Sequence, residues 1–222
     1  MPTTSCAIIP GYNAAGTIGP VIQQVKQLGL EVIVVNDGST DPTAQTATEA
    51  NAIVISHVRN LGKGFALRTG FAYALQAGYE TIVTLDSDGQ HDPVEIPRLL
   101  EAAHNTPRAL VIGQRIMANG SAMPGARRWT NRLMSWIVSR LARQSVPDSQ
   151  CGFRVIHRQL LETVQLSTCR FEIETELVLA AARLGWQIHS VPIRTIYDQH
   201  QSHIHPVLDG VRFDVPDTPG NA

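Results

Sequence analysis

Short apolar runs that alternate with helix-like segments constrain the fold of this 222-residue chain more than any other feature. The runs are rich in Ile and Val, and each ends at polar or turn-forming residues. Buried strands that alternate with helices are typical of a mostly parallel central sheet flanked by helices. The sequence therefore predicts an α/β fold. The expected strands are Cys6–Pro10, Val32–Val35, Ala52–Ile55 and Thr81–Leu85, and the helices between them are residues 17–28, 42–50 and 62–77.

Polar side chains follow three of these strands at the point where each strand ends. The clusters are Tyr12-Asn13, Asn36-Asp37-Gly38-Ser39 and Asp86-Ser87-Asp88. In parallel α/β sheets, ligands bind beyond the carboxyl ends of the strands. We therefore expect the three clusters to meet at one edge of the sheet and to form a binding site there.

The second half of the chain is less regular, and it contains no internal repeat or linker. We expect one domain over residues 1–205, followed by a short amphipathic segment and a polar tail over residues 206–222. The expected elements of this half are a strand that ends near 111–113, a helix over 127–143, a helix over 172–184 and a strand over Gln187–Val191.

Charge is distributed unevenly along a chain whose net charge is −1. The total excludes a general attraction to nucleic acid. No acidic residue lies between Glu101 and Asp148, however, and seven arginines do. In the helix expected over residues 127–143, apolar residues recur every fourth position. Such a basic amphipathic helix either lies in a membrane interface or packs its apolar face on the core. The apolar positions are Trp129, Leu133, Ile137 and Leu141.

Cysteine content and the N-terminal sequence indicate the compartment. The three cysteines have no metal-like spacing, which is typical of reduced thiols. The first residues resemble a strand and not a signal peptide, and no apolar run is long enough to span a membrane. We expect a cytoplasmic protein that is soluble or bound peripherally to the cytoplasmic face of a membrane.

The acidic turn after the fourth strand is a candidate metal site. Asp86 and Asp88 are two residues apart on a tight turn, and Gln90 adds a neutral oxygen. Mg²⁺ or Mn²⁺ takes one or two carboxylates and completes its shell with substrate phosphates and water. The alternative is an Asp-rich turn that caps the following helix.

Six segments, in order along nearly the whole chain, resemble family 2 glycosyltransferases of the GT-A fold. The later segments resemble the dolichyl-phosphate mannose synthase-like branch of that family. Two positions depart from its pattern: Ala14 stands where a Glu is common, and Asn36 where an Asp is common. The segments are Ile8–Asn13, Val35–Asp41, Asn60–Gly70, Leu85–Gln90, Asp148–Arg154 and Ser202–Pro206.

The resemblance implies an inverting enzyme that moves a hexose from a nucleotide-sugar, of the GDP-mannose or UDP-glucose type, to a polyprenyl or dolichyl phosphate. It implies a metal on Asp86 and Asp88, with Asp88 taking part in catalysis. Lys63, between two glycines at a helix start, adds a charge for the donor phosphates. The expected donor-binding residues are Pro10, Tyr12, Asn13, Asp37, Lys63, Asp86 and Ser87.

On the acceptor side we expect arginines, because a guanidinium binds phosphate through two hydrogen bonds. Asp148 is the candidate general base; alternatively it orients an arginine. In the resembling family, a residue after Ser202 reaches the pyrophosphate or the metal, and His203 matches that place. The expected acceptor- and phosphate-binding residues are Arg115, Arg127, Arg128, Gln150, Arg154, Ser202 and His203.

Other functions remain open at this point. The chain could transfer sugar to a different acceptor, or it could be a nucleotide-sugar-binding module that works with a membrane-protein partner. A nucleotidyltransferase would need a Gly-rich, basic loop after its first strand, and Gly11-Tyr12-Asn13-Ala14 does not match one. A dinucleotide-dependent dehydrogenase would need a GxGxxG motif there, which is absent.

Overall fold

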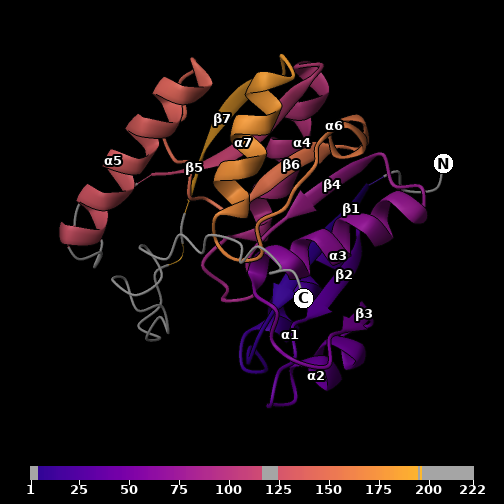
Figure 1. Cartoon of the computed structure of the whole chain (residues 1–222). Helices are drawn as coiled ribbons and strands as arrows, with labels where there is room; N and C mark the ends of the chain where they lie inside the picture. Colours follow the sequence, from indigo (N-terminus) through magenta and orange to yellow (C-terminus); the bar gives the residue numbers. More distant parts are fainter. Residues whose placement is uncertain (1–4, 117–124, 195, 197–222) are drawn as a thin grey trace, which may run out of the picture.

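The computed structural model describes residues 5–116, 125–194 and 196, with the side chains of 125–128 left out (Figure 1). The expected boundary at residue 205 and the tail over 206–222 lie outside this part. The elements are β1 (Ser5–Gly11), α1 (Ile18–Gln27), β2 (Glu31–Asn36), α2 (Thr43–Glu49), β3 (Ile53–Ser56), α3 (Lys63–Gln76), β4 (Thr81–Thr84), η1 (Pro93–Glu95), α4 (Ile96–Asn105), β5 (Ala109–Arg115), α5 (Gly125–Ala142), β6 (Arg154–His157), α6 (Arg158–Thr163), α7 (Ile173–Arg183) and β7 (Gln187–Ile193).

The described strands form one seven-stranded sheet in the order β3-β2-β1-β4-β6-β5-β7. All neighbouring pairs are parallel except the two that involve β6, which runs antiparallel to both β4 and β5. The prediction of a mostly parallel α/β sheet is confirmed. Strands β2 and β3 are added one after the other on one side of β1, whereas β4 pairs with the other side of β1. Because such crossovers are right-handed, α3 lies on the face opposite α1 and α2.

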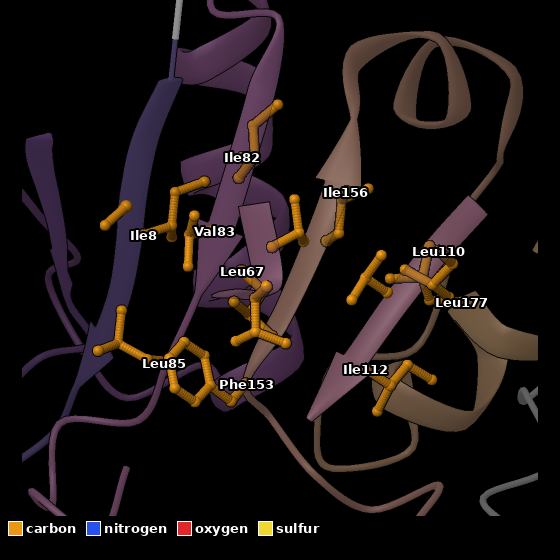
Figure 2. Packing of buried hydrophobic residues seen from close by; sticks show 14 of the residues in the cluster. Ile8, Leu67, Ile82, Val83, Leu85, Leu110, Ile112, Phe153, Ile156 and Leu177 are labelled. Carbon is orange, nitrogen blue, oxygen red and sulfur yellow. The ribbon is translucent and has the colours of Figure 1, made fainter. Parts of the chain in front are cut away.

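The strands near the centre of the sheet are apolar on both faces because helices cover both. Every residue of β1 after Ser5 is buried, and so is every residue of β2 after Glu31. Figure 2 shows Ile8, Ile82 and Ile156, which lie on one face of neighbouring strands, with Leu67 of α3 and Leu177 of α7 near them. Gly70 allows α3 to approach closely, since a Cβ there would lie 2.6 Å from Ile8 Cγ2. On this face α3 packs against β1 and β2, and α7 packs against β7.

No bounds were predicted for α4, β6 and α6. Strand β6 has only four residues and begins with Arg154, a charged residue. Its strand conformation depends on pairing with β4 and β5, which is a long-range contact that no local pattern shows. The antiparallel insertion brings residues 148–153, which precede β6, to the carboxyl end of β4.

The loop after β2 depends on a glycine at a close backbone crossing. Gly38 has a φ of 69°, in the left-handed region that favours glycine. A Cβ at this position would lie 2.3 Å from the carbonyl carbon of Arg59 and 2.5 Å from the nitrogen of Asn60. Both atoms belong to the backbone, so they cannot move aside as a side chain would. Gly38 therefore holds the β2 loop against the segment that leads into α3.

We predict that Gly38→Ala lowers the free energy of unfolding by about 3 kcal/mol, because it combines left-handed strain with a backbone clash. Gly29→Ala is the matched control: its φ is also positive, at 81°, but nothing lies within 4 Å of the added Cβ. We expect that control to cost about 1 kcal/mol, from strain alone. Urea denaturation followed by circular dichroism measures both changes. Equal losses would show that the crossing at Gly38 is not tightly packed.

Candidate active site

The acidic turn lies at the carboxyl end of β4, as the sequence predicts, and the start of α1 supports it. Thr17 donates a hydrogen bond from its hydroxyl to the carbonyl of Ser87, at 2.7 Å. The backbone N–H of Gln90 donates to the Asp88 carboxylate, at 2.9 Å. These two bonds fix the turn at both of its middle residues. They leave Asp86 directed toward the protein and Asp88 exposed.

Asp86 is held between two basic side chains. Its Oδ1 lies 2.6 Å from Lys63 Nζ, and its Oδ2 lies 3.3 Å from His91 Nε2. Burial acts in the opposite direction, but the Lys63 charge and the hydrogen bond from His91 lower the pKa of Asp86 well below its usual range. A Cβ on Gly152 would lie 2.8 Å from Asp86 Oδ1, so only glycine lets the segment before β6 approach this carboxylate. Asp86 is therefore an ionised, tightly enclosed carboxylate.

Lys63 connects this turn to α7. Its Nζ also lies 2.7 Å from Glu174 Oε1, and it stands 5.7 Å from the centre of the Phe171 ring. Burial alone would lower the pKa of Lys63, but the charges of Asp86 and Glu174 outweigh it and raise that pKa. Lys63 is therefore a permanent positive charge beside the acidic turn. It stands where the sequence analysis expects a charge for the donor phosphates.

The turn has the ligand chemistry of a Mg²⁺ or Mn²⁺ site but not a complete cage. In the described part of the chain, no three His, Cys, Asp or Glu side chains converge on one point. Partial loss of solvation and the Asp86 charge raise the pKa of Asp88, and a divalent cation would relieve that repulsion. Asp88, Asp86 and the half-buried Gln90 supply hard oxygen ligands, and such cations take the rest from phosphates and water. The residues present fit a cation that binds together with a diphosphate.

Asp37 is turned into the protein, and its donor-binding role stays a prediction. Its carboxylate is buried and accepts hydrogen bonds from the backbone N–H groups of Leu61 and Gly62, at 2.9 and 2.8 Å. His57 Nδ1 lies 2.7 Å from Oδ1 of the same carboxylate. The carboxylate therefore fixes the loop before α3. The backbone N–H of Phe65, in the first turn of α3, donates a hydrogen bond to the Cys169 carbonyl and is not open to an anion. Lys63 therefore acts on the site through its ammonium group and not through the N-terminus of the helix.

The other expected donor residues lie at the ends of β1 and β2. Pro10 is buried within β1, so its ring is not open to a ligand. Tyr12 is 49% exposed and available to stack on a ring. Asn13 accepts a hydrogen bond from the backbone N–H of Thr40, at 2.8 Å, and so joins the two loops. Ser87 is half-buried on the acidic turn. Of this group, Tyr12, Asn13 and Ser87 have the exposure that a ligand contact needs.

Asp148 is bound to Arg115 at the end of β5. Arg115 donates from Nε and Nη2 to the two carboxylate oxygens, at 2.7 and 2.9 Å, and its backbone N–H donates as well. This geometry suits the alternative in which Asp148 orients an arginine, and its role as general base stays a prediction. Arg115 is half-buried at the end of β5.

Arg154 and Gln150 are also occupied within the protein. The Arg154 guanidinium is 2% exposed and donates to the carbonyls of Cys151, Glu174 and Ser149. Binding an acceptor would require Arg154 to give up some of these bonds. The Gln150 amide donates to Thr175 Oγ1 at 3.2 Å. The Arg127 and Arg128 side chains, and all of Ser202 and His203, lie outside the described residues.

Two residues of the site were not among those expected: His91 and Glu174. His91 follows the acidic turn directly in the sequence, and this proximity was the available signal. Glu174 is one of three alternating acids in Phe171–Glu176, a pattern that favours a role as helix N-terminal charge. Only the packing of α7 beside α3 brings Glu174 to Lys63.

The sequence profile of glycosyl transferase family 2 matches residues 6–165. The chain is 31% identical, over 87% of its length, to a UDP-N-acetylglucosamine–dolichyl-phosphate N-acetylglucosaminyltransferase of Methanococcus voltae, of which it covers 86%. It is 29% identical, over 84% of its length, to the polyprenol monophosphomannose synthase of Mycolicibacterium smegmatis, of which it covers 75%.

The fold is also similar to solved structures. Glucosyl-3-phosphoglycerate synthase of Mycobacterium tuberculosis matches with a TM-score of 0.72 at 25% identity, over 93% of this chain and 74% of that one. Its complex with Mn²⁺, UDP and glucosyl-3-phosphoglycerate has the same TM-score at 24% identity, over 90% and 73% of the two chains. The profile match over most of the chain, the identity to the relatives and the shared fold lead to one assignment. The chain is a glycosyltransferase with a GT-A fold and belongs to glycosyl transferase family 2.

Proposed function

We propose that this glycosyltransferase moves a hexose from a nucleotide-sugar to a polyprenyl phosphate, with inversion at the anomeric carbon and with Mg²⁺ or Mn²⁺ as cofactor. The observation that carries the proposal is the acidic turn, where Asp88 is exposed and Asp86 is ionised beside Lys63. Two relatives support this class of acceptor, because they are named as enzymes that act on dolichyl phosphate or form polyprenol monophosphomannose.

The residues of the site suit a negatively charged leaving group. When bound, the cation neutralises charge on the departing nucleoside diphosphate. Asp86 and Asp88 hold it, and Lys63 adds a fixed positive charge at the same place. An oxygen of the acceptor phosphate attacks the anomeric carbon as the bond to the donor phosphate breaks. The electron pair of that bond leaves with the nucleoside diphosphate.

The state of Asp148 agrees with a phosphate acceptor. An alcohol must lose a proton as it attacks, whereas a phosphate is already ionised near neutral pH and needs no strong base. Asp148 is bound to Arg115 on both oxygens. Held in this way, Arg115 presents its charge at the carboxyl end of β5. We assign Arg115 to the acceptor phosphate.

Helix α5 presents an apolar face that suits a lipid surface. Its inward residues are Ser135, Val138 and Ala142, whereas Trp129 and Trp136 are 67% and 58% exposed. The stripe residues Trp129, Leu133 and Leu141 are exposed, so packing on the core, one of the two alternatives for this stripe, does not describe them. Figure 1 shows α5 at the outer side of the molecule, beside α7. Within the described residues, no helix is long and apolar enough to cross a membrane. We propose peripheral binding to the cytoplasmic face through α5.

Release of nucleoside diphosphate tests the reaction directly. The assay offers GDP-mannose, UDP-glucose and UDP-N-acetylglucosamine with Mg²⁺ or Mn²⁺, with and without a short-chain polyprenyl phosphate. Release that needs both the cation and the lipid phosphate supports the proposal and names the donor. Release with 3-phosphoglycerate in place of the lipid would favour a different acceptor. Donor binding without release would favour a nucleotide-sugar-binding module.

We predict that Asp88→Asn lowers kcat/KM by about 100-fold or more, because it removes a charged ligand of the cation while the shape of the side chain is kept. Nucleoside diphosphate release at saturating Mn²⁺ measures the loss. Glu101→Gln is the matched control, since Glu101 is exposed on α4. Circular dichroism checks that both variants fold. Turnover within threefold of the wild type would remove Asp88 from the metal site.

We predict that replacing both Trp129 and Trp136 with Ser weakens binding to phosphatidylcholine–phosphatidylglycerol vesicles by about tenfold or more, because two aromatic side chains leave the lipid interface. Vesicle co-sedimentation measures the binding. The control is Val94→Ser, which removes an apolar side chain that is 73% exposed away from α5. Unchanged vesicle binding in the double variant would show that α5 does not contact the membrane.

A further inference from the structure

Lys63 is shared by two carboxylates that come from different parts of the fold. Asp86 belongs to the turn after β4, and Glu174 belongs to the first turns of α7. The two contacts have nearly equal length, 2.6 and 2.7 Å. The proposed function needs Asp86 as a ligand of a divalent cation, whose positive charge repels the ammonium group on Asp86 Oδ1. A cation at Asp86 would therefore weaken the hold of this carboxylate on Lys63.

The buried position of Glu174 favours a positively charged partner for its carboxylate. It is 5% exposed, and its Oε2 has no hydrogen-bond partner in the described part of the chain. The backbone around it is fixed, because Arg154 donates to its carbonyl at 2.7 Å. A cavity of about 10 Å³ adjoins it and is large enough for one water at most. A buried carboxylate is costly without a charged partner, and among the described ion pairs only Lys63 provides one.

The backbone of Lys63 is also fixed, so only its side chain can respond to a ligand. A Cβ on Gly62 would lie 2.4 Å from the Cys169 carbonyl oxygen, and one on Gly64 would lie 2.6 Å from the Cys169 carbonyl carbon. The start of α3 is thus packed against the loop before α7. Because this loop leads into Glu174, the lysine and its second partner share one rigid support.

We propose that Glu174 is a positioning residue that retains Lys63 beside the acidic turn when a divalent cation and the donor diphosphate occupy Asp86. The inference rests on the proposed function, and it adds a role for a residue that does not touch the donor. Before ligands bind, Lys63 neutralises Asp86 and keeps the turn folded. Once the cation binds there, Glu174 keeps the ammonium group within reach of the diphosphate.

A purely local role for Glu174 would leave Lys63 unaffected. At the N-terminal end of α7, a carboxylate stabilises the helix through its dipole, and Glu172 and Glu176 stand there as well. Glu176 holds the backbone N–H groups of Ser167 and Thr168. Of these three glutamates, only Glu174 forms a described ion pair with Lys63. The test must therefore read the state of Lys63 itself.

Lysine labelling provides that measurement without any ligand. The chain has two lysines, Lys26 and Lys63, so brief acylation followed by peptide mass spectrometry compares them within one sample. We expect Glu174→Gln to raise the Lys63-to-Lys26 labelling ratio by about tenfold, because the ammonium group loses one of its two anchors. Glu172→Gln, the same change at an exposed position of α7, leaves the ratio unchanged. If Glu174→Gln does not fold, Glu174→Asp tests the same contact with a shorter side chain.

The affinity for Mn²⁺ alone, from electron paramagnetic resonance titration, tests the competition at Asp86. In Glu174→Gln the cation competes with Lys63 for its last carboxylate, so we expect Mn²⁺ binding to weaken about tenfold. In a Lys63→Met background no ammonium group competes, and adding Glu174→Gln then changes Mn²⁺ affinity by less than about twofold. This double-variant comparison separates an effect through Lys63 from a general change of charge.

The outcomes separate this inference from the proposed function. An unchanged labelling ratio in Glu174→Gln overturns the positioning role, whatever reaction the protein catalyses. Equal weakening of Mn²⁺ binding in both backgrounds overturns the retention of Lys63 through Glu174. A wild-type protein that binds no Mn²⁺ contradicts the metal-dependent function, and the labelling ratio still decides whether Glu174 positions Lys63.

Discussion

The ion pair between Lys63 and Asp86 joins the parts of the fold that no strand pairing connects. It links the start of α3 to the turn after β4, and through Glu174 it also reaches α7. Removing one member of this pair leaves the other charge with fewer partners inside the protein, which destabilises the fold. The pair is therefore a structural constraint as well as a feature of the site. The negative turn is compatible with folding because a positive charge is already in place.

A second layer of buried polar contacts supports this pair. Asp37 holds the loop that leads into Lys63, and Arg154 holds the backbone around Glu174. Neither side chain is exposed, and each satisfies backbone groups that would otherwise be buried without partners. Such residues belong to the same sequence motifs as ligand-binding residues, because the loops that approach a ligand must themselves be fixed. A motif alone does not separate the two roles.

Much of the fold could be predicted from the sequence, because the first half is governed by local periodicity. The strands around Ile8, Val34 and Val83 are apolar runs with clear ends, and the acidic turn follows one of them directly. The remainder depends on contacts between distant segments. Strand β6 forms only between β4 and β5, and Asp148 is paired only because β6 brings it to Arg115. The orientation of α5, with its tryptophans outward, is likewise set by which residues fit against α7 and not by the apolar period.

The reversed direction of β6 has a consequence for how such an enzyme can change. A parallel strand in its place would present the residues that follow it to the site, whereas β6 presents those that precede it, Asp148 to Phe153. The loops after β1, β2 and β4, where we propose donor binding, and this later segment therefore meet at the same edge but belong to separate stretches of the chain. Substitutions before β6 can change that segment while the loops after β1, β2 and β4 keep their geometry. Under the proposed function, donor and acceptor preference can then evolve one at a time.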